Sequence, residues 1–382
     1  MPLPLGPEVD SWPRPLPLRQ KFQGQRVTLE PLARRHAPDM FEAAQFDAES
    51  FTYVSASPWE SVAATEAFIA THHADPTRVC WAIRPVTSGR VSGMISLINI
   101  EPANAAIEVG GVWFGPELRR TRAATEAVFI LLRHVADDLG YRRLVWTCDA
   151  LNAASRRAAL RFGFIYEGTL HAHMVRKGHQ RDTAFYAMLA KDWPNRRAAL
   201  LAWLDETNFD AEGTALRSLQ DIRLAQSITR IRPRQREDQG WIQELLNLRW
   251  GSPMMAVAGE LIDLLHADAL ITDTHEGLLT YRRVGDALEI LSFDTTRQGN
   301  GLGTALLAAL KTQARAQGIT QLRVITTNDN LASLRFYQSR GFYLTELRQN
   351  AVAQARLQKP EIPLHGAFNI PLRDELVLVC AL

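Results

Sequence analysis

The hydrophobic and polar positions of the chain repeat one plan in its two halves. A strand of mostly apolar residues is followed by a tight turn and an amphipathic helix, and then by a second strand and a second helix that ends at a Gly-Phe pair. In the first half the predicted features are strand 107–114, helix 125–140, strand 144–148 and Gly163-Phe164. In the second half they are strand 288–293, helix 304–318, strand 322–327 and Gly341-Phe342.

The spacing between these features also agrees. The asparagine of the second strand–helix junction follows the end of the turn by 28 residues in the first half (Ala124 to Asn152) and by 27 in the second (Gly303 to Asn330). The Gly-Phe pair begins 11 residues later in both halves. An ordered set of matching intervals is not expected by chance, so the sequence predicts a tandem duplication of an α/β domain, each copy a mixed twisted sheet flanked by helices.

The same pattern predicts the domain limits. The helix at 193–204 closes the first copy, and the segment after it has no sustained period and contains Gly, Asn and Asp. The predicted organisation is an extended proline-rich arm at 1–19, an N-terminal domain at 20–207, a linker at 208–226 and a C-terminal domain at 227–382.

Composition narrows the classes of partner. The 382 residues are 46% hydrophobic and 22% charged, with no apolar run of the length of a membrane span. The net charge of +2 lacks the basic excess typical of nucleic-acid binding, and neither nucleic acid nor membrane is expected as a partner. The start lacks the order of a secretory signal and the three cysteines lie far apart, which favours a cytoplasmic location. No metal site is predicted, because His171 and His173 are too few ligands.

The turn before the first helix of each copy predicts an anion site. The first amides of a helix have no partners within the helix, and the helix dipole favours negative charge there. Glycines in such a turn let the backbone approach a diphosphate closely. A tight turn without a ligand is the alternative for either copy alone, and the repetition favours a site. The turn of the second half reads Gln298, Gly299, Asn300, Gly301, Leu302, Gly303.

The motif Gln-x-x-Gly-x-Gly, followed by Asn-x-x-Ser-x-x-Phe-Tyr before Gly-Phe, resembles the GNAT superfamily of acyl-CoA-dependent N-acetyltransferases over about 226–346. The tail KPEIPLHGAFNIPLRDELVLVCAL resembles a bacterial GNAT group of unknown substrate. Over about 20–207 the first half resembles the ribosomal-protein alanine N-acetyltransferase branch, through VTLEPL, IEVGGVWFGPELRRTRAATEA, CDALNAASRRAALRFGFIYEGTL and KGHQRDTAFYAMLAKDWP. The resemblance implies two tandem GNAT domains with acetyl-CoA as acyl donor.

The resemblance also implies which residues contact acetyl-CoA. In this family the strand before the turn separates from its neighbour, and its amides meet the pantetheine and the thioester. The matching residues are Val112, Trp113, Phe114, Leu291, Ser292 and Phe293. The turns and helix starts would hold the diphosphate through Arg119, Arg120, Thr121, Arg122, Ala123, Ala124, Gln298, Gly299, Asn300, Gly301, Leu302, Gly303 and Thr304. The residues that would orient the pantetheine are Asn152, Ser155, Asn330 and Ser333.

The first half departs from the family pattern in its turn. Arg122 stands where the second half has the central glycine, Gly301. Three guanidinium groups could bind phosphates directly in place of glycine amides. The alternative is a site that no longer binds, in which the arginines are only solvated.

Four residues are candidates for acid–base chemistry. Glu108 and Glu289 on the strands before the turns could each act as general base, directly or through water, or could be structural. Tyr337, seven residues after Asn330, occupies the position of the usual GNAT acid, with core packing as the alternative. The first half has Ala159 there, so Ser155 could protonate the leaving thiolate instead, or could cap its helix.

The implied reaction is transfer of acetyl from acetyl-CoA to a primary amine by direct attack in a ternary complex. The amine would belong to a peptide or protein N-terminus or to an amino-acid-like small molecule. The alternative is that one copy is a non-catalytic acyl-CoA-binding module that regulates or stabilises the other. The loop 349–372, which contains three prolines, is expected to cover the acceptor site of the second half. The acceptors and the oligomeric state stay open, including an internal pseudo-dimer.

Overall fold

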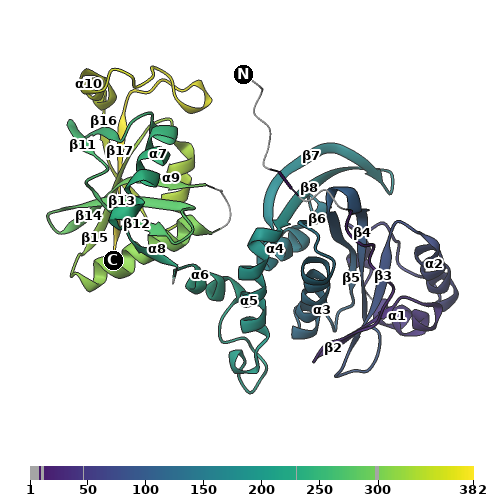
Figure 1. Cartoon of the computed structure of the whole chain (residues 1–382). Helices are drawn as coiled ribbons and strands as arrows, with labels where there is room; N and C mark the ends of the chain where they lie inside the picture. The colour runs from purple at the N-terminus through teal and green to yellow at the C-terminus, as the bar shows by residue number, and fades with distance from the viewer. Residues whose placement is uncertain (1–7, 10–12, 46, 229, 297–300) are drawn as a thin grey trace. The chain divides into compact units, whose positions relative to one another are not determined.

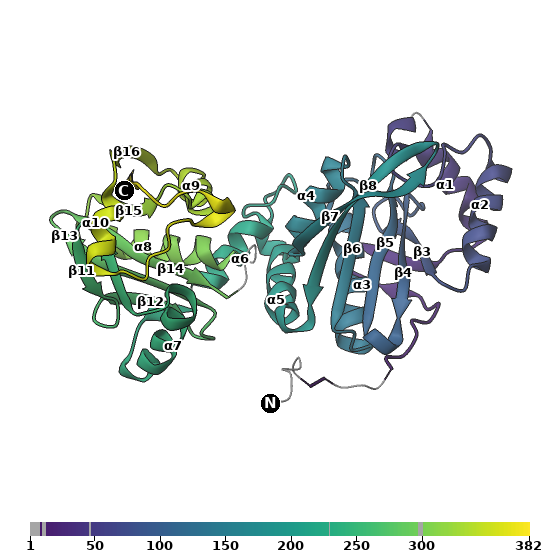
Figure 2. The same cartoon turned by 90° about the horizontal axis from the view of Figure 1, so that it is seen from above.

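The computed structural model describes residues 8–9, 13–45, 47–228, 230–296 and 301–382. The chain divides into two compact units, Met1–Arg223 and Leu224–Leu382, so the division falls inside the segment predicted as a linker (Figures 1 and 2). Each unit is built around one mixed sheet with helices on both faces, as the repeated pattern predicts.

The strands of the first unit form an eight-stranded sheet in the order β1-β2-β3-β4-β5-β6-β8-β7. All neighbours pair antiparallel except β5 and β6, which are parallel. The strands are β1 Phe22–Gln23, β2 Val27–Pro31, β3 Val79–Pro85, β4 Gly93–Glu101, β5 Ala106–Phe114, β6 Arg143–Asp149, β7 Ile165–Arg176 and β8 His179–Leu189. The helices are α1 Ala37–Ala44, α2 Val62–Ala74, α3 Arg122–Arg133, α4 Ala153–Phe162, α5 Trp193–Leu204 and α6 Leu219–Ile228.

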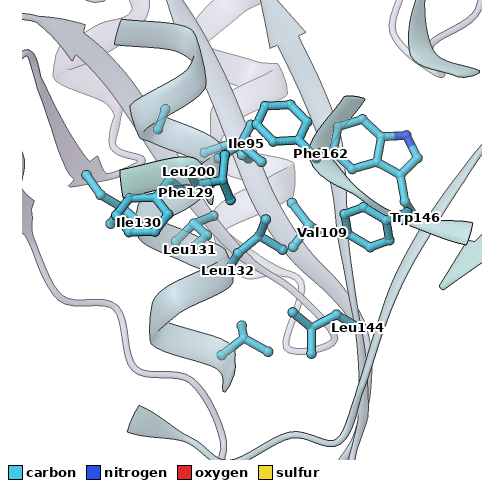
Figure 3. Close-up of a cluster of buried hydrophobic side chains, with 14 of the residues drawn as sticks. Ile95, Val109, Phe129, Ile130, Leu131, Leu132, Leu144, Trp146, Phe162 and Leu200 are labelled. Atoms are coloured by element: carbon cyan, nitrogen blue, oxygen red, sulfur yellow. The ribbon is translucent and has the colours of Figure 1, made fainter. Parts of the chain in front are cut away.

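Helix α3 is the centre of the main core of this unit. Its residues from Ala124 to Leu132 are all buried, because the sheet lies on one side of the helix and α5 on another. Figure 3 shows Leu132 beside Val109 of β5, with Leu144 of β6 in the same cluster. Helices α1 and α2 cover the opposite face of the sheet (Figure 1). The apolar residues Val128 to Leu132 of this helix are stable only in such a buried position.

The second unit has a seven-stranded sheet in the order β16-β17-β15-β14-β13-β12-β9, in which β14 and β15 are the parallel pair. Helices α8 and α9 pack on one face and α7 on the other. The strands are β9 Ile231–Pro233, β10 Met254–Val257, β11 Glu260–Asp263, β12 Asp268–Thr272, β13 Gly277–Val284, β14 Ala287–Thr295, β15 Gln321–Thr327, β16 Tyr343–Arg348 and β17 Glu375–Ala381. The helices are α7 Gln239–Trp250, α8 Leu302–Ala316, α9 Leu331–Gln338 and α10 Ala351–Gln358.

The segment predicted as a linker is packed rather than extended. Leu219 and Ile222 of α6 are buried in the core of the first unit. The side-chain amide of Asn208 donates to the carbonyls of Trp203 and Arg217, and its oxygen accepts from the Arg217 amide. Local periodicity did not reveal this packing because the anchoring residues belong to a loop whose partners are supplied by the preceding helix.

Candidate functional site

The two parallel strand pairs separate within one residue of the equivalent point, just after Glu108 in the first unit and one residue beyond Glu289 in the second. In the first unit β5 and β6 pair only from Ala106–Arg143 to Glu108–Val145, although both strands continue beyond that point. In the second unit β14 and β15 pair only as far as Ile290–Val324. The predicted contact residues 112–114 and 291–293 lie on the unpaired continuations. The backbone groups on that side of each strand therefore face an opening instead of a neighbouring strand.

A β-bulge lies at this opening in each unit. In the first unit it lies beside Gly111, whose φ is +57°, and a Cβ there would come within 3.0 Å of Ser96 Oγ. In the second unit the register shifts between Thr280 and Tyr281, which leaves Leu291 as the extra residue. A bulge bends its strand, and this bend accounts for the separation from the parallel neighbour.

The first turn of α8 has no side-chain cap. Its N-cap residue, Gly301, has a φ of +89°. Gly303 lies against Phe336, since a Cβ at Gly303 would approach that ring to 3.2 Å. Among the described residues, Arg340 reaches this turn and donates to Thr304 Oγ1. Gln298, Gly299 and Asn300, which were predicted to take part, lie outside the described residues.

The N-terminus of α3 is organised differently. Thr121 is the N-cap, and its Oγ1 accepts from the Ala124 amide at 3.1 Å. Helix α3 begins at Arg122, which has a helical backbone, and the left-handed residue of this turn is Arg120, with a φ of +60°. The N-cap position that Gly301 holds in α8 is thus held by Thr121 in α3, and Arg122 is the first helical residue. The amides of Arg122 and Ala123 remain at the first turn.

Two of the three turn arginines have partners within the protein. The Arg122 guanidinium lies 3.6 Å from the centre of the Phe209 ring, bonds to the Leu204 carbonyl and pairs with Glu206 at 3.0 Å. Arg119 donates to the Phe114 carbonyl at 2.9 Å and pairs with Asp47. Arg120 is exposed. Of the three predicted guanidinium groups, the one on Arg120 is the best placed to meet a phosphate.

Asn152 and Asn330 play the same local role in the two units. Each is the N-cap of the helix after the separated strand, and each Oδ1 accepts from the amide three residues on, at Ser155 and Ser333. Since the cap uses only the side-chain oxygen, the side-chain NH2 of each asparagine can donate to a ligand.

The two predicted acids lie in different surroundings. Ser155 Oγ accepts from the Trp146 indole at 3.0 Å, which leaves its hydroxyl proton for another acceptor. Tyr337 is buried and packs against Phe293, Phe336 and Phe342. Burial raises the pKa of Tyr337 far above its usual range, so the phenol keeps its proton.

The predicted bases are both buried but are bonded differently. The Glu108 carboxylate accepts from Asn99 Nδ2 at 2.8 Å and from the amide and hydroxyl of Thr147 at 3.2 and 2.7 Å. Its donors are all neutral. Glu289 instead lies between two guanidinium groups, with Arg282 at 2.8 Å and Arg323 at 3.3 Å. Both oxygens of Glu289 are therefore engaged in ion pairs.

A carboxylate that the sequence analysis missed lies nearby in the second unit. Asp294, on the separated part of β14, accepts from the Trp250 indole at 2.8 Å. Burial raises the pKa of Asp294 above its usual value, and its negative charge in turn raises the pKa of Tyr337. A carboxyl that gains a proton readily, close to a phenol, is suited to acid–base chemistry. The sequence signal that could have revealed Asp294 is its position on the same strand, three residues beyond Leu291.

The loop 349–372 packs over the α7 face of the second unit. Lys359 Nζ donates to the carbonyls of Trp250 and Met254 at 3.3 and 2.8 Å, and Gln358 donates to the Gly259 carbonyl. Because Trp250 also bonds Asp294, the loop is connected to the opening through one side chain. Glu375, at the start of β17, accepts from the Ala258 amide at 3.2 Å.

Comparisons with known proteins decide the family. The description "Acetyltransferase (GNAT) domain" matches residues 26–165, and "Acetyltransferase (GNAT) family" matches residues 264–342. A crystal structure of a GCN5-related N-acetyltransferase from Brucella melitensis is 40% identical, covers 56% of this chain and 97% of its own, and superimposes with a TM-score of 0.55. The chain belongs to the GNAT family of acetyltransferases.

Curated relatives of this chain come from bacteria. The uncharacterized protein YxbD of Bacillus subtilis is 45% identical over 134 residues, which are 34% of this chain and 84% of YxbD. The ribosomal-protein-serine acetyltransferase of Escherichia coli is 33% identical over 97 residues, which are 25% of this chain and 54% of that protein. Both halves thus have the GNAT fold, and the protein is an N-acetyltransferase of a family that uses acetyl-CoA.

Among the described residues no helix is long and apolar enough to cross a membrane. Nor do three or more His, Cys, Asp or Glu side chains come together there in an arrangement that could hold a metal ion.

Proposed function

We propose that both GNAT halves bind acetyl-CoA at the separated parallel strands, and that each transfers the acetyl group to a primary amine by direct attack in a ternary complex. The observation that carries this proposal is the separation of β5 from β6 after Glu108 and of β14 from β15 one residue beyond Glu289. Repetition of an opening that disrupts sheet pairing favours a shared ligand over a structural accident.

The opening supplies hydrogen-bond groups for the donor. Unpaired backbone amides along 112–114 and 291–293 would hold the pantetheine chain and the thioester oxygen, which becomes negatively charged as the amine attacks. The diphosphate would lie at the first turns of α3 and α8, where helix amides point outward. The side-chain amides of Asn152 and Asn330 would donate to the pantetheine carbonyls.

The acid–base groups of the C-terminal half follow from its hydrogen bonds. Asp294, rather than the ion-paired Glu289, would accept a proton from the amine, and the Tyr337 phenol would protonate the leaving thiolate of CoA. The amine becomes an amide, and its proton ends on the carboxylate or on water. The thioester bond breaks without an acyl-enzyme intermediate.

The N-terminal half would use other groups for the same steps. Glu108 would act as base, directly or through one water molecule, because its hydrogen-bond donors are neutral. Ser155 would protonate the thiolate in place of the tyrosine that Ala159 replaces. The acceptor class we propose is a peptide or protein N-terminus or an amino-acid-like amine, which agrees with the name of the Escherichia coli relative.

One observation favours the alternative that the N-terminal half binds acyl-CoA without catalysis. The Thr121 cap occupies the Ala124 amide, and Ala159 removes the usual acid, so this half has fewer groups for the reaction than the other. In that case it would regulate or stabilise the C-terminal half.

Calorimetric titration with acetyl-CoA tests these proposals. Ala123→Glu and Thr304→Glu each place a carboxylate in the first turn of one helix, where it suits the helix dipole but repels phosphates. Wild type should bind two equivalents, each single variant one, and the double variant none. Two sites with activity lost only in Thr304→Glu would make the N-terminal half a binding module. Absence of binding in wild type would reject the acetyl-CoA proposal.

A further inference from the structure

The hairpin of β7 and β8 in the N-terminal half carries two arginines that have no ion-pair partner in the described part of the chain. Arg176 ends β7 and Arg181 lies on β8, directly opposite Met174. Ala184, Tyr186 and Met188 of β8 belong to the core under α3, so Arg181 and Thr183 lie on the other face of the sheet. Glu108 lies on that same face, since its neighbours Ile107 and Val109 belong to the α3 core.

Arg181 is buried, with 7% of its surface exposed, and its Nε has no hydrogen-bond partner. Its Nη1 contacts Met174 Sδ at 3.4 Å, and Nη2 of Arg176 lies 4.0 Å from the same sulfur. A thioether is a weak acceptor, so it does not compensate a buried cation. Among the described residues no carboxylate lies within ion-pair distance of either guanidinium.

Other shielded arginines have oxygen acceptors, either carboxylates or, for Arg223, the carbonyls of Leu160 and Arg161. Arg84 bonds Glu30 at 3.1 Å, and Arg232 bonds Asp238 at 2.8 Å. Burying an unpaired cation destabilises the folded state, and placing a second cation beside it adds repulsion. Burial and the charge of Arg181 both lower the pKa of Arg176, and Asp149 is the carboxylate that opposes this effect. Two converging guanidinium groups with this arrangement suit an anionic ligand.

The location relates this pair to the reaction. Thr183 pairs with Asp149 at the end of β6 that lies beyond the separation from β5, so the hairpin borders the opening. The turn of the hairpin is fixed to the segment 51–56, because Lys177 Nζ donates to the carbonyls of Phe51 and Ala56, both at 2.7 Å. Arg176 also donates to the carbonyl of Tyr53 in this segment. The two guanidinium groups are therefore held in place before any ligand arrives.

We infer that Arg176 and Arg181 bind a carboxylate group of the amine acceptor in the N-terminal half, which makes an amino acid with a free carboxylate or an acidic peptide its substrate class. The inference rests on the proposed transfer reaction in this half. A planar carboxylate can accept parallel hydrogen bonds from one guanidinium and a further bond from the other. The acceptor amine would then be positioned relative to a fixed charge at the edge of the opening.

The test uses the full chain with Thr304→Glu, so that the activity measured belongs to the N-terminal half. The acceptors are free alanine and the peptide amide Ala-Glu-Ala-Gly. Two further peptides carry Gln or Lys in place of Glu, and two others carry the Glu at the third or the fourth position. The acidic peptide, or free alanine, should have a kcat/KM about tenfold above that of the Gln peptide. Free alanine as the preferred acceptor would identify its own carboxylate as the bound group, and a Glu peptide would identify a side chain.

Substitution then assigns the preference to the two arginines. Arg176→Gln and Arg181→Gln should each remove the preference, mainly through KM, and leave the Gln peptide and acetyl-CoA affinity unchanged. Arg157→Gln, at an exposed position of α4, should keep it. If Arg181→Gln does not fold, the half-buried Arg176 decides the outcome. If neutral peptides were acetylated as efficiently as acidic peptides and free alanine, the inference would be overturned while the proposed function would stand. Failure to acetylate any amine, with no acetyl-CoA site in this half, would instead remove the proposed function and the inference with it.

Discussion

Arg340 donates hydrogen bonds from Nε and Nη2 to Oγ1 of Thr304, at 3.2 and 2.8 Å. Thr304 lies in the first turn of α8, so a guanidinium from the segment before Gly341 is fixed beside the helix N-terminus. The N-terminal half has a corresponding contact, from Arg161 to Thr125 at 3.2 Å. A recurring cation at the first turn supports the proposed diphosphate site, because it adds charge to the helix dipole.

The first prediction concerns this cation. Arg340→Gln should raise the Kd for acetyl-CoA of the C-terminal half about tenfold, which corresponds to about 1.4 kcal/mol. The variant's affinity should also fall less steeply with added salt, since one charge contact is lost. Calorimetry in the Ala123→Glu background isolates this half. Arg335→Gln, at an exposed position of α9, is the control and should bind as the parent does. Equal affinities of the two variants would exclude Arg340 from the site.

The second prediction tests Tyr337 as the acid. Tyr337→Phe keeps the contacts with Phe336 and Phe342 and removes only the hydroxyl, so kcat of the C-terminal half should fall about a hundredfold. Acetyl-CoA affinity and thermal stability should stay close to wild type. Tyr343→Phe, at an exposed position of β16, should not change turnover. Steady-state kinetics with a saturating amine measure kcat. An unchanged kcat in Tyr337→Phe would show that this tyrosine only packs in the core.

The third prediction separates two arginines of the first turn. Arg122→Ala should lower the Tm by a few degrees, because it removes a contact with Phe209 worth about 1 kcal/mol, while its ion pair with the exposed Glu206 adds little. Its acetyl-CoA affinity should be unchanged. Arg120→Ala should show the reverse, with weaker and less salt-dependent binding and an unchanged Tm. Weaker acetyl-CoA binding by Arg122→Ala at an unchanged Tm would instead indicate that the Arg122 guanidinium contacts the phosphates.

The fourth prediction is a pH dependence of stability in the C-terminal half. Burial raises the pKa of Glu375 above its ordinary value of 4.5, with Arg348 opposing and Glu289 and Glu346 adding to the shift. The folded state thus holds this proton more tightly than the unfolded state, so stability falls as the pH rises from 4.5 through the raised pKa.

Glu375→Gln can keep the hydrogen bond from the Ala258 amide and has no proton to release. The difference in Tm between this variant and wild type should grow in favour of the variant, to a few degrees, between pH 4 and pH 7. The Tm of the control variant Glu361→Gln, at an exposed position, should change with pH as the Tm of wild type does. Thermal unfolding across this range provides the measurement, and a constant difference for Glu375→Gln would argue against a raised pKa.

The sequence by itself determined the order of the elements, their duplication and the family. Strand 107–114 and helix 193–204 are found within one residue of their predicted limits, because apolar periodicity is a local property of the chain. The N-cap asparagines, Asn152 and Asn330, were recognisable for the same reason, since a cap and its helix are neighbours in sequence.

Only the tertiary structure decided which side chains are available for chemistry. Glu289 and Glu108 hold equivalent strand positions, yet one is ion-paired and the other has neutral partners, because β13 and β15 contribute arginines in only one half. The Arg122 guanidinium contacts the Phe209 ring and the Glu206 carboxylate, which both follow α5 in the chain. Arg181, in contrast, has no anionic partner among the described residues. Such partners come from segments tens of residues away, and the free energy of a buried charge depends on those partners rather than on its neighbours in the chain.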